Sequence, residues 1–130
     1  MSEWIDNQKN LMLFSGRAHP ELAEAVADEL GIKVTPQTAR DFANGELFVR
    51  FEDSVRGSDA FVLQSHSTPI NEAIMELLLM VDAAKGASAA QVTAVIPHFA
   101  YARSDKKDAS RISLGGRLVA DMLATAGVNR

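Results

Sequence analysis

Short apolar runs alternate along this chain with segments in which apolar residues recur every three or four positions. The runs cover residues 11–14, 60–63 and 91–97. Continuous apolar character over so few residues is typical of strands that are buried on both faces. The periodic segments cover residues 20–30, 70–81 and 114–126 and predict helices. The alternation predicts an α/β fold in which helices flank a mostly parallel central sheet.

The region between the first helix and the second apolar run has a different pattern. Residues 32–40 show little periodicity, and Pro36 favours a sheet edge or a loop there. Residues 47–51 alternate between apolar and polar side chains directly after Asn44-Gly45, a dipeptide typical of tight hairpin turns. We therefore expect a further strand at 47–51.

The same pattern predicts one domain that is preceded by a short polar segment. Residues 1–10 are polar and are expected to form a loose segment, and residues 11–130 form the α/β domain. The chain ends at residue 130, where the α/β rhythm requires another strand, and a sheet that stops there would expose an unpaired edge. We expect the domain to be cut before its last strand and the chain to be part of a longer protein.

Composition narrows the function classes. The chain has 130 residues, is 47% hydrophobic and carries a formal charge of −4, so general binding to nucleic acid is not expected. It contains no cysteine, which excludes disulfides and thiolate sites. The N-terminus lacks the pattern of a signal peptide, and Glu76 and Asp82 interrupt the longest apolar stretch. We expect a soluble cytoplasmic protein that does not enter a membrane.

The segment that follows the third apolar run is the richest in candidate chemistry. Four cations occur within nine residues, namely Arg103, Lys106, Lys107 and Arg111. Ligands of open α/β sheets bind beyond the carboxyl ends of the strands, and such a cluster can hold a polyphosphate. Asp105 and Asp108 can orient the cations or lie near a magnesium ion. The alternative is a solvated charged loop.

Aromatic residues in the turn at 41–46 and in the segment after the third apolar run each allow two interpretations. In the turn at 41–46, Phe42 can stack on an adenine ring, with polar neighbours accepting from its amine; the pattern alone favours a plain hairpin turn with Phe42 in the core. Phe99 and Tyr101 are candidates for a nucleobase platform, and their spacing alone favours the core.

The histidines and the serine-rich turns carry weaker signals. His19, His66 and His98 lack the spacing of metal ligands, and His19 is a candidate helix cap. The turns at 15–16 and 65–68 can bind phosphate through backbone amides, although tight turns explain both.

Motifs in order along nearly the whole chain closely resemble those of the ribose-phosphate pyrophosphokinases, also called phosphoribosyl pyrophosphate synthetases. They are Phe-Ala-Asn-Gly-Glu at 42–46, Ser-Val-Arg-Gly at 54–57, Met-Glu-Leu-Leu-Leu-Met at 75–80, Thr-Ala-Val-Ile-Pro at 93–97 and Tyr-Ala-Arg-Ser-Asp-Lys-Lys at 101–107. The resemblance implies the N-terminal one of two similar phosphoribosyltransferase-like domains, in a subunit that usually assembles into hexamers.

The resemblance also implies a reaction and a set of site residues. The reaction is the Mg²⁺-dependent transfer of the β,γ-pyrophosphoryl group of ATP to ribose 5-phosphate, which yields phosphoribosyl pyrophosphate and AMP. Phe42, Asn44, Gly45 and Glu46 would hold adenine from a neighbouring subunit. Arg103, Ser104 and Asp105 would line the ATP site, with Arg103 as the catalytic residue and with Lys106 and Lys107 as possible phosphate contacts.

This chain departs from the family pattern at several points. Ser104 stands where the family usually has glutamine, and Gly115-Gly116 lies where the last helix should start. The family's metal-binding histidine and ribose 5-phosphate loop would follow residue 130, so we expect no metal ligand within this chain and no turnover by this chain alone. The alternative function is that of a non-catalytic relative that binds full-length synthetase subunits and modulates them.

Overall fold

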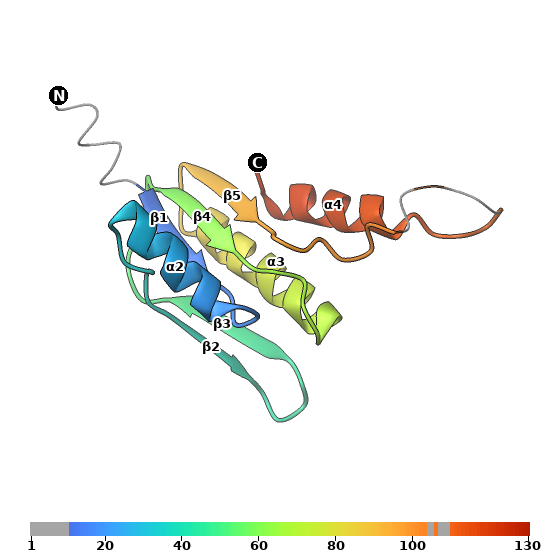
Figure 1. Cartoon of the computed structure of the whole chain (residues 1–130), viewed down its shortest axis with the longest axis horizontal. Helices are drawn as coiled ribbons and strands as arrows, with labels where there is room; N and C mark the ends of the chain where they lie inside the picture. Colours follow the sequence, from blue (N-terminus) through green and yellow to red (C-terminus); the bar gives the residue numbers. More distant parts are fainter. Residues whose placement is uncertain (1–10, 104–105, 107–109) are drawn as a thin grey trace.

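The computed structural model describes residues 11–103, 106 and 110–130, and Figure 1 shows how its elements are arranged. The strands and helices are, in chain order, β1 (Leu11–Ser15), α2 (Pro20–Leu30), β2 (Gln37–Asp41), β3 (Leu47–Phe51), β4 (Asp59–Leu63), α3 (Ile70–Gly86), β5 (Gln91–Val95) and α4 (Gly115–Ala126). The strands expected at 11–14, 47–51, 60–63 and 91–97 and the three helices are confirmed, with the last strand ending at Val95, two residues earlier than expected.

The central sheet is parallel, as expected, and has three strands in the order β1-β4-β5. Ser15 lies opposite Leu63, and Leu63 lies opposite Val95. The carboxyl ends of the three strands therefore meet at one edge of the sheet, and the loops that follow them lie side by side.

Helices cover both faces of this sheet, because successive side chains of a buried strand point to opposite faces. Phe14 packs in a cluster with residues of α3 and α4, whereas Leu13 packs in a second cluster with Ala23 and Ala27 of α2. All of these are buried. The core thus has one helix on one face and two on the other, which explains the continuous apolar runs in the sequence.

The hairpin of β2 and β3 forms a separate antiparallel sheet. Phe51 stacks on Phe14 with ring centroids 4.2 Å apart, which attaches the base of β3 to the core. Residues 37–41 form an edge strand, one of the two alternatives, edge or loop, that the sequence favoured. Pro36 precedes this strand, so its missing N–H does not interrupt the pairing with β3.

The two glycines at the start of α4 have a packing role. The helix begins at Gly115, and a Cβ atom there would lie 3.1 Å from the Cβ atom of Tyr101. At Gly116 it would lie 3.1 Å from the Tyr101 carbonyl oxygen. The glycines therefore let the Tyr101 turn approach the helix, where larger side chains would push it away.

The last residues of the chain follow the outer edge of β5. The Asn129 amide donates to the Val92 carbonyl (2.8 Å), and the Ala94 amide donates to the Arg130 carbonyl (2.9 Å). That a further strand continues this pairing stays a prediction. In the described part of the chain no helix combines the length and apolar character that crossing a membrane requires.

Candidate functional site

The loops that leave the carboxyl edge of the sheet are tied to one another by backbone hydrogen bonds. The Gly16 amide donates to the Leu63 carbonyl (2.9 Å), and the His66 amide donates to the His98 carbonyl (2.9 Å). The β1–α2 turn and the β4–α3 and β5–α4 loops therefore form one continuous rim. Ligands of open α/β sheets bind at this edge.

A cavity of about 850 Å³ on this rim lies between the start of α3 and the loop after β5. Residues 68–72 line one side and residues 98–103 line the other. Arg103, expected to be catalytic, is exposed and lies on this lining. The volume falls in the range of small-ligand pockets, and the guanidinium supplies a fixed positive charge at its wall.

A smaller cavity of about 240 Å³ lies beside it and shares Thr68, Pro69 and Glu72 with the first. Its other wall contains Arg17 from the β1–α2 turn and Asp41 from the end of β2. The two cavities together extend from the hairpin side of the rim to the loop after β5.

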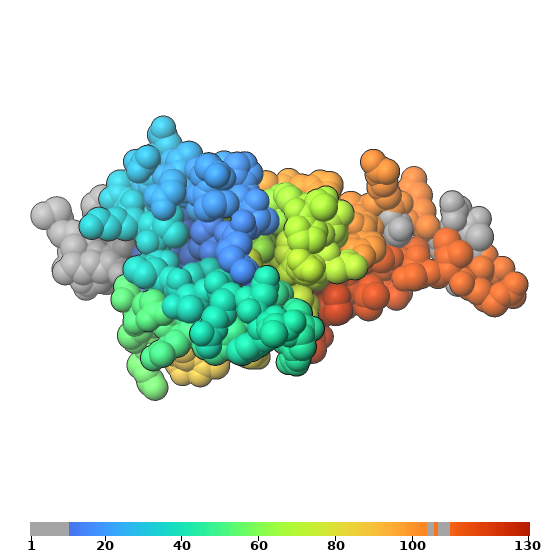
Figure 2. All heavy atoms as spheres, turned by 90° about the horizontal axis from the view of Figure 1, so that it is seen from below, coloured from blue at the N-terminus to red at the C-terminus, as the bar shows by residue number. Residues whose placement is uncertain are grey.

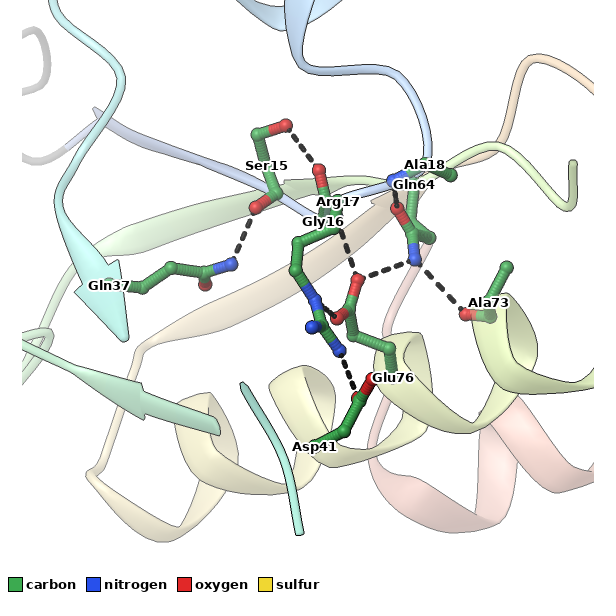
Figure 3. A network of polar contacts seen from close by, with 9 residues as sticks. All are labelled: Ser15, Gly16, Arg17, Ala18, Gln37, Asp41, Gln64, Ala73 and Glu76. Carbon is green, nitrogen blue, oxygen red and sulfur yellow. Dashed lines mark hydrogen bonds and ion pairs between the residues drawn. The ribbon is translucent and has the colours of Figure 1, made fainter. Parts of the chain in front are cut away.

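A polar network in the smaller cavity is built around Glu76, which is only 2% exposed (Figure 3). Its carboxylate accepts from the Arg17 amide (2.7 Å), the Arg17 Nε (2.5 Å) and the Gln64 Nε2 (2.8 Å). The Gln64 Oε1 accepts in turn from the Ala18 amide (3.1 Å). The network fixes the β1–α2 turn against α3 and the end of β4.

Arg17 extends the network to the hairpin. Its Nη2 lies 2.9 Å from the Asp41 Oδ1. Burial alone would lower the pKa of Arg17, but the hydrogen bonds to Glu76 and Asp41 outweigh burial and raise it above its ordinary value. Arg17 is therefore a permanent cation between two carboxylates from different elements.

Sequence reasoning missed this network, although one signal for it was visible. Glu76 interrupts the apolar stretch of α3 at a position that points into the core. A buried carboxylate requires a cation or several donors, because burying an unpaired charge is costly. The signal predicts a partner, but nothing local identifies Arg17.

His66 is fully buried below the rim and holds the loop after β5. Its Nδ1 accepts from the Ala100 amide (2.9 Å), so the neutral ring carries its proton on Nε2. Burial lowers the pKa of His66 from its ordinary value of 6.5, and the charge of His98 lowers it further. Phe99 is partly buried, with its ring centroid 5.2 Å from that of His66.

Tyr101 departs from the expectation that it belongs to the core. It is 44% exposed, has a φ of 65° and donates from its hydroxyl to the Asn71 Oδ1 (2.5 Å). With this left-handed backbone, the side chain reaches Asn71 at the start of α3. The spacing of apolar residues along the sequence does not reveal a left-handed backbone conformation at one residue.

The tip of the hairpin, residues 42–46, is ordered by its own hydrogen bonds. The Phe42 amide donates to the Glu46 carbonyl (2.7 Å), the Gly45 amide donates to the Phe42 carbonyl (2.9 Å), and the Asn44 side chain contacts Glu46. Gly45 has a φ of 92°, which a side chain would strain. The expected tight turn is confirmed.

Phe42, however, is not in the core as the pattern alone favoured. It is 45% exposed and meets the Phe48 ring edge to face at 6.0 Å. The Arg40 guanidinium lies over both rings, 5.6 Å from the Phe42 centroid and 4.9 Å from the Phe48 centroid. One face of an aromatic and cationic cluster is thus open to solvent.

Within this chain the expected site residues form two separate groups. Arg103 lines the large cavity, and in Figure 2 the start of α3 (yellow-green) lies between the hairpin (teal) and the loop after β5 (orange). Residues 42–46 do not line either rim cavity. Lys106 is exposed, while Ser104, Asp105 and Lys107 lie outside the described residues. Among the residues with a described position, no three His, Asp or Glu side chains gather as a metal site would require.

Comparison with known proteins identifies the family that this chain resembles. The model of the N-terminal domain of ribose phosphate pyrophosphokinase matches residues 11–127. Ribose-phosphate pyrophosphokinase of Corynebacterium glutamicum is 64% identical over 99% of this chain and 40% of its own length. That of Streptomyces coelicolor is 54% identical over 95% of this chain and 38% of its own length.

A solved structure has the same fold. The crystal structure of phosphoribosylpyrophosphate synthetase from Mycobacterium smegmatis matches with a TM-score of 0.91 and 63% identity. The match covers 93% of this chain and 41% of that chain. The present chain therefore spans about 40% of the length of the relatives that it matches.

Proposed function

The chain belongs to the ribose-phosphate pyrophosphokinase family, as its N-terminal domain, and on this premise we propose that it supplies the ATP side of the family's active site. The reaction joins the anomeric hydroxyl oxygen of ribose 5-phosphate to the β-phosphorus of ATP. The bond from that phosphorus to the α,β-bridging oxygen breaks, AMP leaves with the bonding electrons, and the hydroxyl proton passes to solvent or a base.

One observation supports this role above the others: Arg103 lines a cavity of about 850 Å³ at the carboxyl edge of the sheet. Phosphoryl-type transfer requires alignment and neutralisation of polyphosphate charge more than covalent help from the protein. A guanidinium at this edge offsets the charge that grows on the AMP phosphate as the bond breaks. Lys106 and Lys107, from the same loop, would attract the triphosphate.

The hairpin tip supplies the second half of the proposed site. Phe42 has an exposed ring that can stack on adenine, and Asn44 and Glu46 place amide and carboxylate groups beside it. Residues 42–46 do not line the cavity that Arg103 lines in the same chain, so the proposal pairs the tip of one copy with the cavity of a second copy. A homo-oligomer, a hexamer in the family pattern, satisfies this geometry.

Mg²⁺ enters this scheme with ATP, as part of the substrate complex. Ser104 and Asp105 stay predicted ATP contacts.

The test is ATP binding and turnover by the intact protein that carries this chain. Arg103→Ala should weaken ATP binding and lower kcat/KM by about ten- to a hundredfold, the cost of a lost charged hydrogen bond. Lys33→Ala removes an exposed charge between α2 and β2 and serves as the control. Normal turnover of Arg103→Ala would refute the assignment. An intact protein that binds full-length subunits without any turnover would instead support the non-catalytic alternative.

A further inference from the structure

The hairpin is attached to the rest of the molecule at both ends of its strands. At the base, Phe51 stacks on Phe14, and the Gln37 side chain donates to the Ser15 carbonyl (2.5 Å). Near the tip, Asp41 forms its ion pair with Arg17. Neither strand pairs with the central sheet.

The attachment near the tip differs in kind from the attachment at the base. All of residues 41–46 are exposed, and the apolar side chains that pack against the core, Val49 and Phe51, belong to β3 rather than to the tip. Among the described residues, the Arg17–Asp41 pair is the one ion pair that joins the hairpin to another element. Figure 3 shows the Arg17 side chain reaching from the β1–α2 turn past Glu76 to Asp41.

Arg17 has two arms, its ion pair with Glu76 and its ion pair with Asp41, and they differ in exposure to solvent. The arm to Glu76 is anchored in the core, because the Glu76 side chain is 3% exposed and is also held by Gln64. The arm to Asp41 is open to solvent, with the two side chains 43% and 59% exposed. A guanidinium that is held on one side still has N–H groups that can hold a second carboxylate in a defined direction. The point charge of a lysine does this less well.

We propose that Arg17 is a positioning residue for the nucleotide site. Held by Glu76, it pairs with Asp41, and we call this Arg17–Asp41 contact the clasp. The clasp sets the angle of the hairpin, so that the tip at 42–46 meets adenine in one orientation. The nucleotide part of this inference rests on the proposed function, whereas the clasp itself does not. Such preorganisation lowers the entropy that binding would otherwise cost.

The clasp is tested by hydrogen exchange in the intact protein. The amides of Phe42 and Gly45 are hydrogen-bonded within the tip and report its opening. Asp41→Ala cuts only the exposed arm, so the variant keeps the buried network and its fold. Exchange at the tip should become about two- to fivefold faster, the effect of losing one exposed ion pair, while exchange in β4 stays unchanged.

Matched variants separate the clasp from a general effect of charge. Arg17→Ala should give the same acceleration at the tip, with added destabilisation of the β1–α2 turn. Arg50→Ala removes an exposed cation from β3 of the same hairpin and should leave tip exchange unchanged. Unchanged tip exchange in Asp41→Ala would overturn the clasp.

Steady-state kinetics separates the clasp from the nucleotide role. If the clasp orients the adenine-binding tip, Asp41→Ala should raise KM for ATP by about the same two- to fivefold and leave kcat unchanged, because the reacting phosphates are held elsewhere. Faster tip exchange with an unchanged KM would leave the clasp standing and overturn the nucleotide role of the hairpin. A fall in kcat with unchanged KM would overturn the positioning role.

Discussion

Replacing Glu76 by alanine removes the acceptor at the centre of the rim network. The carboxylate accepts three hydrogen bonds, two from Arg17 and one from Gln64. Gln64 is 1% exposed, and its Nε2 keeps only the Ala73 carbonyl at 3.3 Å. The Arg17 guanidinium, in contrast, is on a side chain that is 43% exposed and can be hydrated.

The expected loss of stability follows from this difference in exposure. A buried donor without an acceptor costs about 1–3 kcal/mol, and removing one partner of a fully buried ion pair costs about 3–5 kcal/mol. Hydration of Arg17 and relief from burying the Glu76 charge both reduce the cost. We therefore expect Glu76→Ala to lower the free energy of unfolding by about 2–3 kcal/mol, which corresponds to a fall in Tm of about 10 °C.

The assay is thermal and urea unfolding followed by circular dichroism. Glu72→Ala, one turn earlier on the same helix and exposed, controls for helix propensity and net charge and should change the free energy by less than about 0.5 kcal/mol. Glu76→Gln keeps one oxygen acceptor but places an NH₂ group against other donors, so an intermediate loss is expected. Equal stability of Glu76→Ala and Glu72→Ala would refute the argument that the network needs this carboxylate.

Two further predictions concern residues beneath the rim. Gly16→Ala places a Cβ atom 2.0 Å from the Gln64 Oε1 and should lower the free energy of unfolding in urea by about 1–3 kcal/mol. Gly86→Ala, where a Cβ atom meets no atom within 4 Å, is the control and should be neutral or slightly stabilising. Equal effects of the two substitutions would contradict the close packing at Gly16. For His66, whose pKa is lowered in the folded state, the unfolded chain binds the proton more readily, so the free energy of unfolding should fall as pH drops through the ordinary value of 6.5. Urea unfolding between about pH 7.5 and about pH 5.5 should show this fall, and His66→Gln should flatten it; an identical slope in both proteins would contradict the assignment.

Most of the fold could be predicted from local pattern, and the exceptions share a cause. The strands of the central sheet and the helices carry their burial in their own periodicity, so each was visible in isolation. β2 was not, because its residues Gln37–Asp41 are largely polar and partly exposed. A strand of this kind is defined by its partner β3, which begins only after the turn.

The candidate site was predictable in the same uneven way. The motifs at 42–46 and 101–107 identified the family and the hairpin turn, and the end of β5 placed Arg103 at the ligand-binding edge. The apolar spacing alone favoured the core for Phe42 and Tyr101, which was wrong, because spacing does not distinguish a side chain in the core from one on a turn. Their positions depend on Arg40 and on the left-handed backbone at residue 101.

The sequence by itself determined which segments form strands and helices, because backbone geometry repeats every two or 3.6 residues and leaves that period in the apolar pattern. Only the tertiary structure decided that Arg17 meets Glu76, 59 positions away, and Asp41, 24 positions away. Charged side chains at such separations have many possible partners along a chain. The parallel order β1-β4-β5, the packing of α3 beneath the rim and the position of the hairpin reduce these to one.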